Sequence, residues 1–132
     1  MPQLTTPTTV EKALRWALWW LALACWTALL ITTRAATVVA AVVPNHELRF
    51  WVSKTAHVCG YALLSIFAGC LPVRVGWRVA WWLFLVLHAG LTEFIQLFVD
   101  GRSGTLRDVG LDLSGIMLGW VLLSAWQRHR RP

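Results

Sequence analysis

Ionisable and polar side chains interrupt three long apolar stretches of the sequence, and their spacing follows the turns of a helix. In each stretch they recur at helical intervals, which places them on one helix face. A charged group at the centre of a membrane helix costs about 2.5–3.5 kcal/mol to insert, so each one is a candidate functional residue. The three faces consist of Lys54, His57 and Tyr61, of Glu93 and Gln96, and of Asp108, Asp112, Gly115 and Gly119.

These residue types suit the binding of an anion and the transfer of a proton. Lys54 and Arg102 are cations of the kind that bind phosphate or carboxylate. His57 and Glu93 are the candidate catalytic acid and base. No spacing predicts a particular metal site, although the carboxylates could hold a divalent ion, and the cofactor is therefore left unknown. The remaining positions expected in the binding site are Tyr61, Gln96, Asp108 and Asp112.

The same residues also have a purely structural interpretation. A cation near the end of a span, such as Arg107, can extend to the membrane interface, and His57 alone could be a hydrogen-bonded core residue. His88 has no acidic partner in phase and is expected to be such a core histidine. Glu93 and Asp112 fit this interpretation least, because a buried carboxylate needs a cation, a hydrogen bond or a proton. A polar clasp that locks the helices together stays an alternative to a functional site.

Composition assigns the chain to the membrane proteins. Of its 132 residues, 58% are hydrophobic, only 14% are charged and ten are tryptophan, and the mean hydropathy is +0.59. Average soluble chains are about 45–50% apolar and about 25% charged. So few charges cannot cover the surface of a small soluble domain, and disordered chains lack this many aromatic residues. We therefore expect a single all-α integral membrane domain.

Four apolar runs are long enough, or nearly so, to be transmembrane helices. The sequence thus predicts a compact bundle of four transmembrane helices at 16–126, between a cytoplasmic tail at 1–15 and a basic cytoplasmic tail at 127–132. The expected spans are 16–33, 53–71, 77–99 and 106–126.

The region around the first span leaves two questions open. Residues 35–43 are apolar but too few to cross a bilayer, so they either extend the first helix or lie at the interface. Residues 44–51 are expected to form a loop. A signal peptide is a competing interpretation of the first run, but the run is long, rich in tryptophan and followed by further apolar segments.

The basic residues set the expected orientation. Seven Lys and Arg residues lie on the side of the two termini and five on the other, which favours cytoplasmic termini. Topology thus explains the net charge of +6, and no nucleic-acid partner is needed. Seven tryptophans are expected at the headgroup level of the same side. They are Trp16, Trp19, Trp20, Trp77, Trp81, Trp82 and Trp126.

Small residues complete the pattern. Gly115 and Gly119 share a helix face with the aspartates, so they are expected to bring the fourth helix close to a neighbour. Cys25, Cys59 and Cys70 have neither metal-binding nor disulfide spacing. They are expected to be small buried hydrophobic residues.

Four motifs, in this order, resemble those of the VanZ-like family. They are Lys54-x-x-His57, Glu93-x-x-Gln96, Gly101-Arg102 and Asp108-x-x-x-Asp112-x-x-Gly115, and the resemblance covers residues 53–123. Family members usually have Asp where this chain has Ser53, and Asn where it has Asp112. An acidic group has therefore moved from one helix to another, which keeps the local charge.

The resemblance implies a multi-pass protein of the bacterial cytoplasmic membrane, since the named member of the family is associated with teicoplanin resistance. Our first hypothesis is an outward-facing polar cluster that lowers glycopeptide susceptibility by binding or modifying an anionic envelope component. This component would be a lipid-linked cell-wall precursor or a phospholipid headgroup. One alternative is a membrane hydrolase or transferase that acts on a phospholipid or polyprenyl-phosphate headgroup. Another is a structural or accessory subunit without catalysis.

Overall fold

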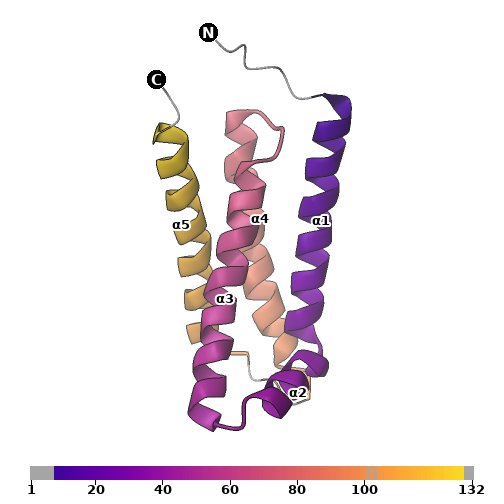
Figure 1. Cartoon of the computed structure of the whole chain (residues 1–132), viewed down its shortest axis with the longest axis vertical. Coiled ribbons are helices and arrows are strands. Elements are labelled where there is room, and N and C mark those ends of the chain that lie inside the picture. Colours follow the sequence, from indigo (N-terminus) through magenta and orange to yellow (C-terminus); the bar gives the residue numbers. More distant parts are fainter. Residues whose placement is uncertain (1–7, 101, 103, 130–132) are drawn as a thin grey trace.

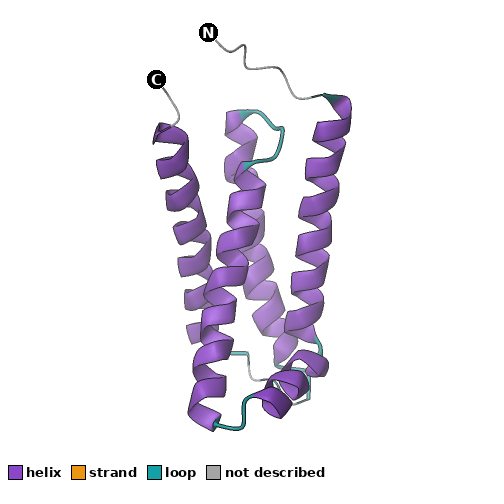
Figure 2. Ribbon diagram, viewed as in Figure 1, coloured by secondary structure: helices purple, strands orange, loops and turns teal. Residues whose placement is uncertain are grey.

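A computed structural model describes residues 8–100, 102 and 104–129, without the side chains of 35 and 36, and every regular element in these residues is a helix. Four long helices run side by side, and a short one lies across one end of the bundle (Figures 1 and 2). The all-α prediction is confirmed. The helices are α1 (Thr9–Ile31), α2 (Thr33–Val42), α3 (His46–Gly69), α4 (Val75–Gln96) and α5 (Leu106–His129).

Three helices, α1, α4 and α5, are long and apolar enough to cross a membrane. The fourth predicted span corresponds to α3, which is of similar length but carries Glu47, Arg49 and Lys54 in its first half. The start of α1 and the end of α5 lie at the same end of the bundle, opposite α2 (Figure 1). At that end the Arg15 guanidinium donates a hydrogen bond to the carbonyl of Cys70, beyond the end of α3 (3.3 Å).

Helix α1 begins at Thr9 rather than at Trp16 because a capping box precedes it. The Thr8 hydroxyl accepts a hydrogen bond from the Glu11 amide (3.2 Å), and the Glu11 carboxylate accepts one from the Thr8 amide (2.8 Å). These bonds satisfy donors that the first turn of a helix leaves free. The helix ends where Thr32 is extended, and α2 is a separate helix. The apolar segment 35–43 therefore does not extend the first helix.

The expected loop at 44–51 is wrong, because α3 already begins at His46. The Asn45 side chain accepts hydrogen bonds from the amides of Glu47 and Leu48 (2.9 and 3.1 Å), which is the role of a helix N-cap. The helix consequently includes more than a turn of sequence that composition alone had assigned to a loop.

Helices α3 and α5 form the most extensive backbone contact of all helix pairs. The glycine pattern predicted that this last helix packs closely against a neighbour. A Cβ atom added at Gly115 would overlap the carbonyl oxygen of Val58, and one added at Gly119 would overlap that of Ala62. Only a residue without a side chain permits this backbone contact. The Ser65 hydroxyl donates to the Ile116 carbonyl in the same interface (2.8 Å).

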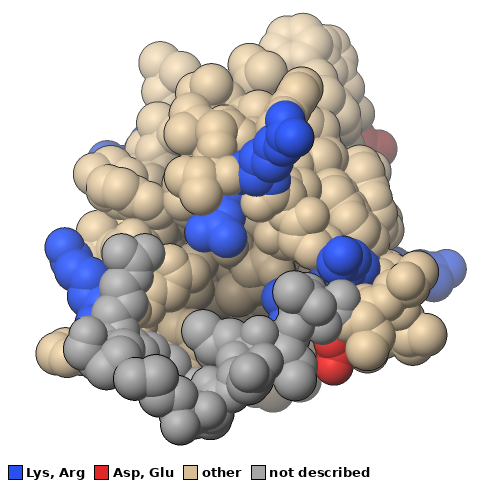
Figure 3. Space-filling model, turned by 90° about the horizontal axis from the view of Figure 1, so that it is seen from above, with Lys and Arg blue, Asp and Glu red and all other residues tan. Residues whose placement is uncertain are grey.

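The tryptophans near the termini do more than mark an interface. Trp19 is fully buried, and its ring meets those of Trp16 and Trp81 edge to face, with centroids 6.5 and 5.0 Å apart. It is therefore part of the core between α1 and α4 and does not face the lipid headgroups. Trp77 and Trp126 are exposed, as interface residues would be. Lys and Arg side chains lie around this end of the molecule (Figure 3).

The outer surface of the bundle is apolar. Large side chains such as Leu87 and Phe98 are more than 70% exposed, which a water-facing surface of this extent would not tolerate but lipid does. Cys25, Cys59 and Cys70 are exposed as well. The expectation that they are buried is wrong, because Cys25 and Cys59 lie on helix faces that point away from the core and Cys70 follows the last residue of α3.

We expect Gly119→Leu to destabilise the bundle, because the new side chain would be forced into the α3 backbone. Overpacking typically costs about 1–3 kcal/mol, and rigid backbone cannot move aside as a side chain can. Thermal unfolding in detergent, followed by circular dichroism, should show a lower midpoint and less monodisperse protein.

The matched control is Gly110→Leu in the same helix, where an added Cβ meets nothing. It should unfold close to the wild-type temperature. Equal effects of the two substitutions would contradict the close α3–α5 contact.

Candidate functional site

A cavity of about 570 Å³ opens at the α2 end of the bundle. One part of its wall is apolar and includes Trp26, Phe50 and Val39. The other part is charged. Its cations are Arg49, Lys54 and Arg102, its histidines are His46 and His57, and its acidic residue is Asp108. A volume of this size is typical of small-molecule binding sites.

Two charged pairs cross from α3 to α5 next to this cavity. The Lys54 ammonium lies 2.5 Å from Oδ1 of Asp108, and Nδ1 of His57 lies 2.8 Å from Oδ1 of Asp112. The two pairs are one helical turn apart, as the spacing of both faces predicted. Both aspartates are at least 97% buried, so their charges depend on these partners.

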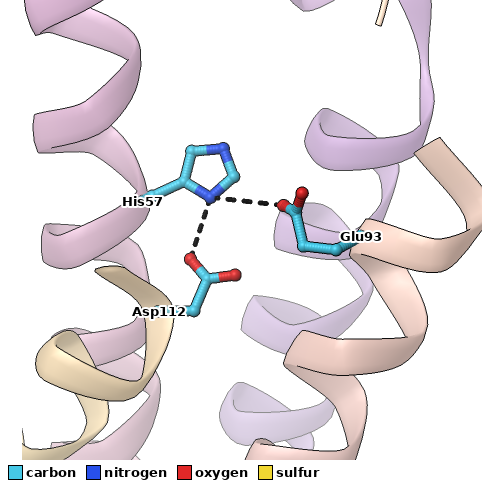
Figure 4. Close-up of side chains that lie close together, drawn as sticks. All are labelled: His57, Glu93 and Asp112. Carbon is cyan, nitrogen blue, oxygen red and sulfur yellow. Dashed lines mark hydrogen bonds and ion pairs between the residues drawn. The ribbon is translucent and has the colours of Figure 1, made fainter. Parts of the chain in front are cut away.

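Helix α4 adds a third side chain to the deeper pair. Oε1 of Glu93 lies 3.7 Å from Nδ1 of His57, which is beyond hydrogen-bond distance but close enough for an ion pair. The three side chains point toward one another from three helices (Figure 4). Each of them is at least 96% buried. The structure thus brings together the three residues that the sequence had singled out on separate helices.

Several polar atoms of this cluster lack a hydrogen-bond partner among the described residues. They are Oε1 of Glu93, Oδ2 of Asp112 and Nε2 of the neighbouring Gln96. Buried polar groups are nearly always satisfied in proteins. Two acceptors and one donor at one place are therefore a feature that a structural clasp does not account for.

Thr105, which the sequence analysis missed, connects the two charged layers. Its amide donates to Oε2 of Glu93 (3.0 Å), and its hydroxyl donates to Oδ2 of Asp108 (3.0 Å). The Asp108 amide donates back to this hydroxyl (3.2 Å). The sequence did hold a signal, because Thr followed three residues later by Asp before an apolar run is typical of a helix start. The adjacent Gly104 has no room for a side chain beside the Glu93 carbonyl.

Arg102 lies at the cavity but does not contact the cluster directly. Its guanidinium donates to the carbonyls of Leu29 and Thr32 (2.7 and 3.2 Å), where α1 ends and its last carbonyls are otherwise free. Burial lowers the pKa of Arg102, and Glu93 opposes this shift. Nε of Arg102 is buried and has no acceptor in the part of the chain that the structure describes.

Tyr61 belongs to a second polar layer and not to the cluster around His57. Its hydroxyl lies 3.0 Å from that of Thr92 and 3.1 Å from Nδ1 of His88. Nε2 of His88 lies 2.9 Å from the hydroxyl of Thr27. The predicted hydrogen bonding of His88 is confirmed, although its side chain is half-buried and not part of the fully buried core. Trp26 separates the layers, since its ring contacts both His57 and Tyr61 edge to face.

The remaining polar residues near the site lie at its margin. Asp100 and Arg107 are exposed, which agrees with the interface role expected for Arg107. Ser53 lines the cavity in place of the aspartate that is usual in the family. Arg49 and His46 also line it and were missed, because the segment that holds them had been assigned to a loop.

The comparisons with known proteins identify the family of this chain. No curated protein and no solved structure matches it. The family model VanZ/LLP1 matches residues 18–127. This range includes both charged pairs, Glu93 and the cavity, together with all or most of each of the three helices that are apolar enough to cross a membrane. The chain therefore belongs to the VanZ/LLP1 family of membrane proteins.

Proposed function

We propose that this protein binds the anionic headgroup of an envelope lipid, or of a lipid-linked cell-wall precursor, in the cavity at the α2 end. The observation that carries the proposal is the charge of the cavity wall. Three cations line it, against one carboxylate, Asp108, which is already paired with Lys54. Arg49 and Arg102 are therefore left with a positive charge that an anion would neutralise.

The two arginines also retain free hydrogen-bond donors. One terminal nitrogen of Arg49 donates to the Pro44 carbonyl (2.9 Å), but its Nε is buried without an acceptor in the described residues, as is that of Arg102. A guanidinium has five donors arranged to match phosphate or carboxylate oxygens. The apolar part of the wall, with Trp26 and Phe50, would accommodate the chain of a lipid.

The proposal treats α3 as a fourth transmembrane helix. Lys54 and His57 face the other helices and are paired there, so they do not meet lipid. The surface that α3 presents outward includes Leu63 and Phe67, which are exposed and apolar. With four spans, the basic end with both termini would lie in the bacterial cytoplasm and the cavity would open to the outer face of the cytoplasmic membrane. Binding there could lower teicoplanin susceptibility.

A membrane hydrolase or transferase acting on the headgroup phosphate is the second candidate. The pair of His57 and Asp112 favours it, because a carboxylate at Nδ1 orients an imidazole as a general base. Nε2 of His57 points away from both carboxylates (Figure 4). It would take the proton of an attacking water or alcohol and return it to the departing oxygen as the phosphate ester bond breaks.

We expect Arg102→Gln and Arg49→Gln to weaken binding of a short-chain polyprenyl phosphate to the purified full chain. A hydrogen bond to a charged group contributes about 1.5–3 kcal/mol, so each substitution should raise the Kd about tenfold or more. Fluorescence titration in detergent, using the intrinsic tryptophans, measures this change.

The matched ligand is the same polyprenol without its phosphate, which should bind weakly to wild type and variants alike. The matched variant is Arg34→Gln, which removes an exposed cation of α2 and should bind like the wild type. Equal affinity for the phosphate and the alcohol would overturn the proposed anion site.

We expect the wild-type chain to raise the teicoplanin concentration that inhibits a susceptible bacterial host, and His57→Ala and Glu93→Gln to abolish this effect. Both substitutions remove a member of the buried cluster, of which His57 lines the cavity. Inhibitory concentrations should be compared at equal amounts of folded protein, measured as monodisperse yield in detergent.

If both variants fail to accumulate, the cluster serves as a structural clasp. If expression of the wild-type chain leaves susceptibility unchanged, the proposed role in resistance is wrong.

A further inference from the structure

We infer that His57, Glu93 and Asp112 form a binding site for one divalent transition-metal ion. This site lies next to the cavity, which His57 lines, and does not depend on the anionic ligand proposed for the cavity wall. It rests on the geometry, the charge and the unsatisfied atoms of these three side chains.

The geometry fits a single ion. One ligand atom from each residue can be chosen so that all three lie within 4.8 Å of one another. Nδ1 of His57 is 2.8 Å from the Asp112 carboxylate and 3.7 Å from that of Glu93. Metal bonds to nitrogen and oxygen of about 2.0–2.2 Å place two ligands of a tetrahedral ion about 3.4 Å apart. Small side-chain rotations would therefore suffice to close the three atoms around an ion.

The charge of the cluster also calls for a cation. Glu93 and Asp112 are two adjacent carboxylates that are almost fully buried. Within the described parts of the chain, their ion pairs are with His57 alone, and neither has a Lys or Arg nitrogen within 4 Å. One imidazolium would leave a buried negative charge, which is costly. A divalent ion with a neutral imidazole balances both carboxylates.

The unsatisfied atoms are an independent observation. Oε1 of Glu93 is directed at His57 (Figure 4), yet it has no hydrogen-bond partner in the described residues, and neither does Oδ2 of Asp112. Both side chains are more than nine-tenths buried. A metal ion takes such oxygens as ligands and so supplies the partner that the protein lacks.

The surroundings hold the ligands as metal sites usually require. The other oxygen of Glu93 accepts a hydrogen bond from the Thr105 amide (3.0 Å), which fixes the carboxylate from behind. Such outer contacts orient the ligands of metal sites. The three ligands come from α3, α4 and α5 (Figure 4), so packing of the bundle sets their positions.

The ligand set indicates the class of ion. One imidazole with two carboxylates suits Zn²⁺ or Mn²⁺ better than Ca²⁺, which prefers oxygen ligands only. Three protein ligands leave a coordination position for water or another ligand, as in catalytic sites. His57 and Gln96 both line the cavity, from which such a further ligand would come, and Nε2 of Gln96 is unpaired in the described structure.

The test measures metal bound to the full chain in detergent after treatment with a chelator. Dialysis against micromolar Zn²⁺ or Mn²⁺, followed by elemental analysis, should give one ion per chain. His57→Gln, Glu93→Gln and Asp112→Asn should each weaken binding by more than about tenfold, since even loss of an outer contact costs about 10–100-fold. His88→Gln and Asp100→Asn, which change a histidine and an acid outside the cluster, should bind like the wild type.

A spectroscopic measurement on the wild type covers the case in which a cluster variant does not fold. Electron paramagnetic resonance of bound Mn²⁺ should detect coupling to a single imidazole nitrogen, which persists in His46→Gln and His88→Gln. Absence of a bound ion, or of this coupling, would overturn the inference and leave a cluster that shares protons. Polyprenyl-phosphate binding that survives chelation would leave the anion site intact, so the two proposals can fail separately.

Discussion

The structure depends on the pairing of charged side chains between α3 and α5. Asp108 and Asp112 are at least 97% buried inside the bundle, so each carboxylate needs a partner on a neighbouring helix. Lys54 and His57 supply these partners at 2.5 and 2.8 Å. Such short distances require the two backbones to approach closely, and the glycines of α5 provide that space one and two turns further along. The charged pairs and the close helix packing therefore depend on each other.

This constraint divides the bundle into two ends with different interiors. Near the termini, Trp19 and its aromatic neighbours fill the space between α1 and α4, and no charge is needed for packing. At the α2 end the interior also holds charged side chains, and the cavity lies between the last turns of α1, α2 and the first half of α3. The intermediate layer around Tyr61 and His88 is polar but satisfied by hydroxyl groups. The unsatisfied carboxylate oxygens belong instead to the layer of Glu93 and Asp112, next to the cavity that His57 lines.

Much of the candidate site could be predicted from helical spacing. The polar faces with Lys54, Glu93 and Asp112 each lie on a different helix, and an apolar environment forces such faces inward. Hydropathy does not predict the features of the fold that local hydrogen bonds decide. The N-cap at Asn45 extended α3 into an expected loop, and Thr105 joined the charged layers through its amide and hydroxyl. Hydropathy carries no information on these bonds, although the capping residues themselves stand in the sequence.

By itself, the sequence determined the all-α class, the membrane-type composition, the polar helix faces and the glycine contact, because these follow from periodicity and from the cost of charge in lipid. Only the tertiary structure decided that His57 meets both Asp112 and Glu93 while Tyr61 turns to His88. It also decided that Trp19 is core and that the cysteines face outward. Which side chains share a partner depends on the rotation and depth of each helix. Those are set by packing across the bundle and not by the spacing of residues along one helix.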